Sequence, residues 1–265
     1  MPVSCRAIGR NVSRALMQTF FAKGEIDVLG GNILKLYLAI LAVILLVGSV
    51  PAATIVVCPS GCNYSIIQQA IDSSHAGDTI LVQSGTYHEN VYVSKGIILR
   101  GVDTGKGKPV VNAGGSGSVI TLYADNVTLE GFNATGSGSC GCGNAGIKIM
   151  SNNSTIIGNT AYENKYGIYC GNHMGNNIYR NDLVKNNIST YDGGKNMWYA
   201  DIVAKNGVVR LVPGHKAVGN YYSDFDQPGQ GCNDTNRDGI CDSPLKIKGG
   251  SNVDKYPLTS GNAVP

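Results

Sequence analysis

The middle of the chain repeats itself, and this constrains the fold more than any other feature. Residues 155–170, TIIGNTAYENKYGIYC, align without a gap on residues 177–192, NIYRNDLVKNNISTYD, at an offset of 22. An earlier copy runs from 128 to 149, with an insertion of six residues within 136–143. A fixed period of this length indicates a solenoid, in which each repeat is covered only by its neighbours.

Each copy holds short apolar runs, such as Thr-Ile-Ile and Gly-Ile-Lys-Ile, separated by Gly or Asn. Short β-branched runs between turn residues predict strands. Leucine-rich repeats have a similar period, but they need a regular Leu framework, and Leu is sparse here. We therefore expect a parallel β-helix. Asn159 and Asn181 fall on one corner, where we expect left-handed backbone and hydrogen bonds along the stack, a role in the scaffold and not in a site.

A stack of coils has two exposed ends that must be covered. Residues 65–74, SIIQQAIDSS, have apolar positions at helical spacing after a Ser, which predicts a capping helix on the first coil. Residues 219–265 are aromatic and rich in loops, and we expect them to form a C-terminal cap. The β-helix itself is expected over residues 54–218, which leaves residues 1–53 outside the fold.

Residues 36–50, LYLAILAVILLVGSV, are uncharged, follow basic residues and precede Pro51-Ala52-Ala53. This is the pattern of a secretion signal, although an uncleaved membrane anchor has the same pattern. We expect a secreted or cell-surface protein, anchored to a membrane only if this segment is retained. The net charge of +3 is small and concentrated upstream of the apolar segment, so no nucleic-acid partner is expected.

Seven cysteines follow the apolar segment, and an oxidising compartment would let them pair. We expect Cys58 to bond Cys62, and Cys232 to bond Cys241. Cys170 would take either Cys140 or Cys142 and leave one thiol over. The alternative is a thiolate metal site formed by these three cysteines with His173.

Seven asparagines beyond the apolar segment stand in glycosylation sequons, as in glycosylated surface proteins, although an Asn-rich chain produces some by chance. They are Asn63, Asn126, Asn133, Asn152, Asn153, Asn187 and Asn233.

The cap contains the first part of a calcium-loop pattern, D-x-[DN]-x-[DN]-G. Its oxygen ligands would be Asp234, Asn236, Asp238 and Asp242, and the closing Glu is replaced by Leu245. Asp224 and Asp226 are candidates to complete the site. The alternative is an Asp/Asn turn closed by Cys232 and Cys241. In both cases the expected role is to stabilise the cap, with Ca²⁺ as a structural ion.

The run at 66–93, IIQQAIDSSHAGDTILVQSGTYHENVYV, resembles the opening of pectate-lyase-like right-handed β-helix proteins. GNYYSDFD at 219–226, DTNRDGICDSP at 234–244 and NVDKYPL at 252–258 are similar to NosD-like β-helix proteins (PbH1 repeats) on the surfaces of methanogenic archaea. The resemblance implies an all-β fold, a single-stranded right-handed parallel β-helix. It also implies copper handling, which we do not expect because His75, His88, His173 and His215 are scattered and only His173-Met174 is suggestive.

Three functions follow. The first is a non-enzymatic envelope protein whose lateral face contacts cell-envelope glycans or surface proteins. The second is a polysaccharide lyase or epimerase, but the acids of the repeats form no obvious cluster, so no catalytic residue is assigned. The third is a copper-handling accessory protein.

Overall fold

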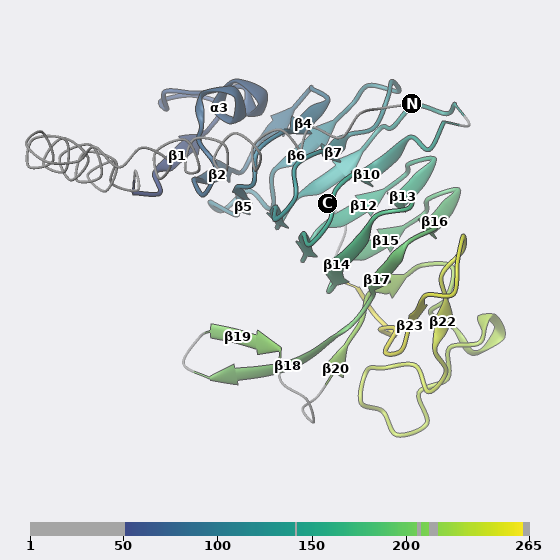
Figure 1. Ribbon diagram of the computed structural model, residues 1–265. Helices are drawn as coiled ribbons and strands as arrows, with labels where there is room; N and C mark the ends of the chain where they lie inside the picture. Colours follow the sequence, from purple (N-terminus) through teal and green to yellow (C-terminus); the bar gives the residue numbers. More distant parts are fainter. Residues whose placement is uncertain (1–50, 141, 206–207, 212–216, 262–265) are drawn as a thin grey trace, which may run out of the picture. The chain divides into compact units, whose positions relative to one another are not determined.

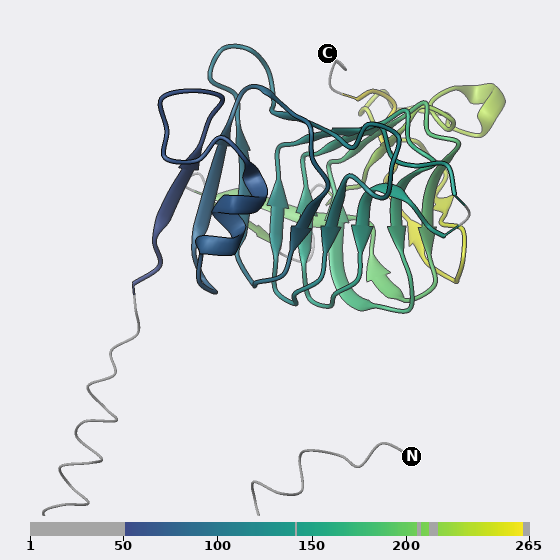
Figure 2. The ribbon, with the colours of Figure 1, turned by 90° about the horizontal axis from the view of Figure 1, so that it is seen from above.

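The computed structural model describes residues 51–140, 142–205, 208–211 and 217–261. Its fold is the expected right-handed parallel β-helix, in which three parallel sheets line the sides of one stack of coils (Figure 1, Figure 2). The expected signal or anchor at 36–50 and His215 lie outside the described residues. Within the described residues, no helix is long and apolar enough to cross a membrane.

The three sheets are built by strands that recur once in each coil. Sheet A consists of β1 (Thr54–Val57), β2 (Thr79–Gln83), β5 (Ile98–Val102), β8 (Thr128–Glu130), β11 (Thr155–Ile157), β14 (Met174–Tyr179) and β17 (Lys195–Met197). Sheet B consists of β3 (Thr86–Tyr87), β6 (Val110–Asn112), β9 (Asn133–Thr135), β12 (Thr160–Tyr162), β15 (Asp182–Val184) and β21 (Tyr221–Tyr222). Sheet C consists of β4 (Val91–Val93), β7 (Ile120–Leu122), β10 (Ala145–Ile149), β13 (Tyr166–Cys170) and β16 (Ile188–Asp192).

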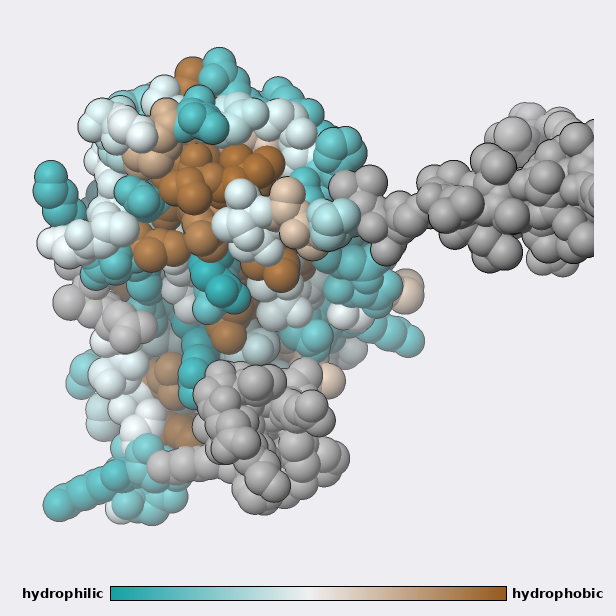
Figure 3. Space-filling view, turned by 90° about the vertical axis from the view of Figure 1, so that its left-hand side faces the viewer, coloured by the Kyte–Doolittle hydropathy of each residue, from teal (hydrophilic) through white to brown (hydrophobic). Residues whose placement is uncertain are grey.

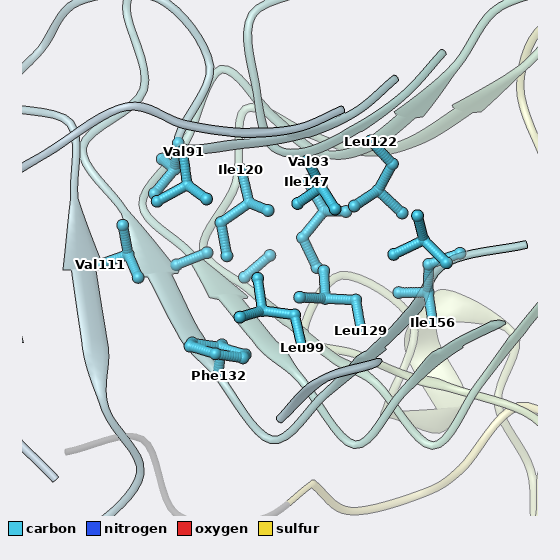
Figure 4. Close-up of a cluster of buried hydrophobic side chains, with 14 of the residues drawn as sticks. Val91, Val93, Leu99, Val111, Ile120, Leu122, Leu129, Phe132, Ile147 and Ile156 are labelled. Atoms are coloured by element: carbon cyan, nitrogen blue, oxygen red, sulfur yellow. The ribbon is translucent and has the colours of Figure 1, made fainter. Parts of the chain in front are cut away.

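The strand register confirms the sequence repeat. Ile156 pairs with Ile178 at the predicted offset of 22, and Leu129 pairs with Ile156 at the offset of 27. Because each residue lies directly beside its repeat equivalent, like side chains form ladders through the core. Leu99, Leu129 and Ile156 form one such ladder, and all three are fully buried (Figure 4). Burial of each of these side chains stabilises the stack by about 1.5–3 kcal/mol.

One corner of the stack carries a ladder of buried asparagines. The side-chain amide of Asn159 donates to the amide oxygen of Asn181 at 3.1 Å, and Asn181 donates to Asn220 at 2.9 Å. All three side chains are fully buried, which confirms a structural role. The expected left-handed backbone is misplaced by one residue, because it belongs to Gly158 (φ 63°) and Arg180 (φ 55°). The preceding residue makes the turn, and this directs the asparagine side chain into the stack.

The first coil is covered by α3 (Ile67–Ser73), which buries Ile67, Ala70 and Ile71 against the core. The helix was expected to begin on a Ser, but Ser65 does not cap it. The carboxylate of Glu89 accepts hydrogen bonds from the backbone N–H groups of Ile67 and Gln68, both at 2.9 Å. A charge from the next coil therefore satisfies the N-terminus of the helix.

Among the described residues, one isolated bridge from Val57 to Tyr64 pairs with the outer edge of β1. Figure 3 faces this end of the stack and shows apolar side chains gathered on its surface. Ile55 and Val56 of β1 are half-buried, and they line a small pocket of about 400 Å³ with residues 61–64.

The other end is covered by the last part of the chain. An antiparallel sheet of β18 (Ala200–Lys205), β19 (Val208–Leu211) and β20 (Ala217–Val218) leaves the stack after β17. The chain then returns, because β21 pairs with β15 as the last strand of sheet B. A 3-10 turn (Pro228–Gln230) and the hairpin of β22 (Leu245–Lys246) and β23 (Val253–Asp254) complete the cap.

Candidate functional site

The predicted calcium loop is closed by its own hydrogen bonds. The carboxylate of Asp234 accepts the backbone N–H groups of Asp238 and Gly239, each at 3.0 Å. Asn236 accepts from Asp238 at 3.1 Å, and Asp242 accepts from Thr235 at 2.9 Å. These bonds turn several oxygen atoms toward the backbone of one short loop.

Asp224 and Asp226 have hydrogen-bond partners outside this loop. Asp224 accepts a hydrogen bond from the Ser189 hydroxyl at 2.6 Å, and Asp226 accepts one from the Tyr221 hydroxyl at 2.6 Å. Burial and the nearby Asp226 raise the pKa of Tyr221 to about 12, so this phenol stays protonated as a donor. Across the described part of the chain, no three side chains of the His, Cys, Asp and Glu types gather where they could hold a metal ion.

Two of the expected disulfides are present, Cys58–Cys62 and Cys232–Cys241. The expected bridge from Cys170 is wrong, because Cys140 bonds Cys142 and Cys170 is a free thiol. Cys170 lies at the end of β13 with its side chain in the core, whereas Cys140 and Cys142 are exposed on their loop. Burial and the nearby Asp192 raise the pKa of Cys170 to about 12, which makes it an unreactive thiol.

The sequon asparagines divide into exposed and buried positions. Asn133 is 3% exposed on sheet B, so a glycan cannot be attached there in the folded protein. Asn152 is half-buried. The exposed sequon asparagines are Asn63, Asn126, Asn153, Asn187 and Asn233. Asn126 and Asn153 have left-handed backbone, at φ 62° and 56° respectively, which places them at the tips of tight corners.

The sequence analysis did not identify a column of polar residues on the outer face of sheet B. Asn133, Thr160, Asp182 and Tyr221 are register partners on successive coils. The ammonium of Lys108 lies 3.4 Å from the Thr160 hydroxyl, and burial lowers its pKa although Asp182 opposes that shift. The pair was hidden in sequence because 74 residues separate Lys108 from Asp182.

The carboxylate of Asp182 is 1% exposed. The backbone of Gly261 lies so close to Asp182 and the ring of Tyr221 that a side chain at position 261 would collide with both. The terminal segment therefore covers this column.

Tyrosines line the outer face of sheet C. The rings of Tyr169 and Tyr191 stack on adjacent coils at 4.9 Å, and Tyr166 contacts both rings edge-on. Gly143 lies against the Tyr169 ring, and Gly249 lies against the Tyr191 ring. The tyrosine ladder therefore uses its ring faces for its own packing and strengthens sheet C.

Part of the chain is similar to known proteins. The NosD family, described as periplasmic copper-binding protein (NosD), matches residues 108–227. A cell surface glycoprotein of Methanothermus fervidus is 32% identical over 134 residues, which are 49% of this chain and 21% of that protein. The chain thus spans about a fifth of the length of this curated relative.

The solved structures to which the chain is similar include pectin methylesterases. A complex with hexasaccharide VII has a TM-score of 0.37 and 13% identity, over 68% of this chain and 63% of the other. The enzyme PemA from Erwinia chrysanthemi has a TM-score of 0.36 and 12% identity, with the same shares covered. The enzyme from Aspergillus niger has 0.35 and 15%, over 66% of this chain and 84% of the other.

Proposed function

We propose that the protein is a non-enzymatic cell-surface glycoprotein that displays a rigid lateral face outside the cell, and the match of residues 108–227 to the NosD family supports this. Its length and its ladders hold the faces of sheets A, B and C in fixed positions. Such faces suit contact with envelope glycans or neighbouring surface proteins.

The observation that carries the proposal is the placement of the sequons. Among the described residues, five sequon asparagines are exposed, and two of them, Asn126 and Asn153, project from corners of the stack. The similarity to a cell surface glycoprotein and the three disulfides support the same location, since disulfides persist in oxidising compartments.

Protease treatment of intact source cells, followed by mass spectrometry of the released peptides, tests the proposal. We expect peptides of the β-helix to be released without cell lysis. We also expect glycans on peptides with Asn126 or Asn153 and none on the peptide with Asn133. Release only after lysis would refute the surface location, and a glycan at Asn133 would contradict the folded structure.

The Lys108–Asp182 pair favours a second candidate, a polysaccharide lyase or epimerase. Burial lowers the pKa of Lys108, and a lysine so shifted is better suited to abstract a proton. The full chain would be incubated with polyuronates while the absorbance of unsaturated products and the epimer ratio are followed. Activity that disappears in Lys108→Met but persists in Lys106→Met would establish the enzyme. If the natural chain forms no product, these substrates are excluded.

A further inference from the structure

A cavity of about 550 Å³ opens where the end of sheet A meets the C-terminal cap. Its walls come from β14, from β17 with the residues that follow it, and from residues 251–255 around β23. Figure 1 labels these three strands. This volume lies in the range of small-molecule sites. The cavity is separate from the Lys108–Asp182 pair on sheet B and from the loop at 234–242.

The charged side chains that line the cavity are all positive. Lys195 and Lys255 line the cavity, and none of the described residues that line it is acidic. Asp254 is adjacent in sequence, but its side chain is fully buried and accepts hydrogen bonds from Asn220 and Tyr222. The cavity should therefore have a positive potential that attracts anions.

An aromatic ring forms part of the wall. Tyr199 contacts Tyr256 edge-on at 5.3 Å between ring centroids, and the Lys255 ammonium lies 5.1 Å from the centre of the Tyr199 ring. Two contacts therefore hold this ring in place. A fixed aromatic wall offers an apolar surface to a flat ligand such as a sugar ring.

Polar groups without partners complete the wall. In the part of the chain that the structure describes, the side chains of Asn177, Ser251 and Lys195 make no hydrogen bond or ion pair with the protein. Asn176 and Asn196, by contrast, are hydrogen-bonded to each other within the stack. The cavity thus combines one cation, one amide and one hydroxyl that are available to a ligand.

We propose that this cavity binds an acidic saccharide, with a carboxylate at Lys195, a sugar ring against Tyr199, and hydroxyl groups at Asn177 and Ser251. The proposed surface role supplies a source of such ligands. Binding to the purified protein is measured independently of where the protein is located, so the two proposals can fail separately.

Calorimetric titration of the full-length chain with a uronic-acid disaccharide tests this site. The neutral disaccharide of the same linkage and inorganic phosphate serve as comparison ligands. We expect the acidic disaccharide to bind at least about ten-fold more tightly than either, and binding to weaken as salt screens the charge.

Lys195→Gln should weaken binding about five- to ten-fold, whereas Lys106→Gln, which removes the same charge from an exposed loop far along the sequence, should have no effect. Asn177→Asp places a negative charge in the wall and should abolish binding, and thermal unfolding would show that each variant is folded. Equal affinity for the neutral disaccharide or for phosphate, no binding, or equal effects of Lys195→Gln and Lys106→Gln would overturn the proposal.

Discussion

At the scale of single residues, asparagine suits the inner corner because its amide donates and accepts at once. The Asn181 amide group donates to the carbonyl of Ile156 at 2.9 Å, and its oxygen accepts from the backbone of Asn159 at 3.0 Å. Both partners belong to the preceding coil. The last rung differs, because Asn220 donates to Asp254, whose carboxylate only accepts. The sequence predicted the ladder at Asn159 and Asn181, but it did not reveal that Asp254 ends it.

Replacement of Asn181 by alanine should destabilise the protein by about 2–4 kcal/mol, because it leaves buried backbone and amide groups without partners. Urea unfolding followed by circular dichroism would measure the change. Asn187→Ala is the control, since Asn187 is exposed, and its effect should stay within about 0.5 kcal/mol. Equal losses in the two variants would contradict the ladder.

Asp254 should make the stability of the cap depend on pH. Burial raises its pKa to about 6, above the ordinary value of 3.8, although the donors around it oppose that shift. The folded state therefore favours the protonated carboxyl group. Its contribution is fully present below about pH 4 and is lost as the pH rises through 6, by roughly 3 kcal/mol.

The test is the difference in melting temperature between the natural protein and Asp254→Asn from pH 3.5 to 7. The titration of other acids cancels in this difference, including that of Asp78 and Asp103, whose pKa values are lowered by backbone hydrogen bonds. We expect the natural protein to lose stability relative to the variant across this interval. A constant difference would show that Asp254 does not titrate there.

At the scale of elements, the capping helix shows what a local pattern predicts and what it omits. The spacing of Ile67, Ala70 and Ile71 identified the helix and its buried face. Its N-terminal partner, Glu89, lies 22 residues beyond Ile67 and belongs to the next coil. Such a partner is set by the stacking of coils, which local sequence does not encode.

Glu89→Gln should destabilise the protein by about 1 kcal/mol, because the helix N-terminus loses a carboxylate that accepts two backbone hydrogen bonds. Thermal unfolding would measure it, with Glu163→Gln on an exposed corner as the control. Added salt should reduce the difference between the two variants. If salt has no influence, the charge of Glu89 is not what caps the helix.

The loop at 234–242 remains a predicted calcium site, and the expected effect of Ca²⁺ is on the stability of the cap alone. We expect Ca²⁺ to raise the melting temperature of the chelator-treated protein, because the oxygens of Asp234, Asn236 and Asp238 share one loop. Asp234→Asn should lessen the rise, whereas Asp226→Asn should leave it unchanged, since Asp226 bonds Tyr221 instead. No rise with Ca²⁺, or equal rises in both variants, would leave the loop as a hydrogen-bonded turn.

At the scale of the whole molecule, the repeat predicted the fold because register and sequence period coincide. Ile147 lies beside Ile168, and Tyr169 beside Tyr191, as the alignment requires. The period was uninformative where the chain leaves the stack, at the antiparallel strands β18, β19 and β20. It also could not reveal the Lys108–Asp182 pair or the cavity at the cap, because both join segments from different parts of the chain.

Because the asparagine ladder repeats from coil to coil, the stack can take an additional coil. A second copy of residues 155–176 inserted after Asn176, with isoleucine at the copied Cys170 as at Ile149, would meet like partners above and below. We expect this protein to fold, to lengthen by about 4.8 Å, and to unfold with a larger urea m-value. Gene duplication would thus lengthen such a molecule by whole coils without any new kind of contact between coils.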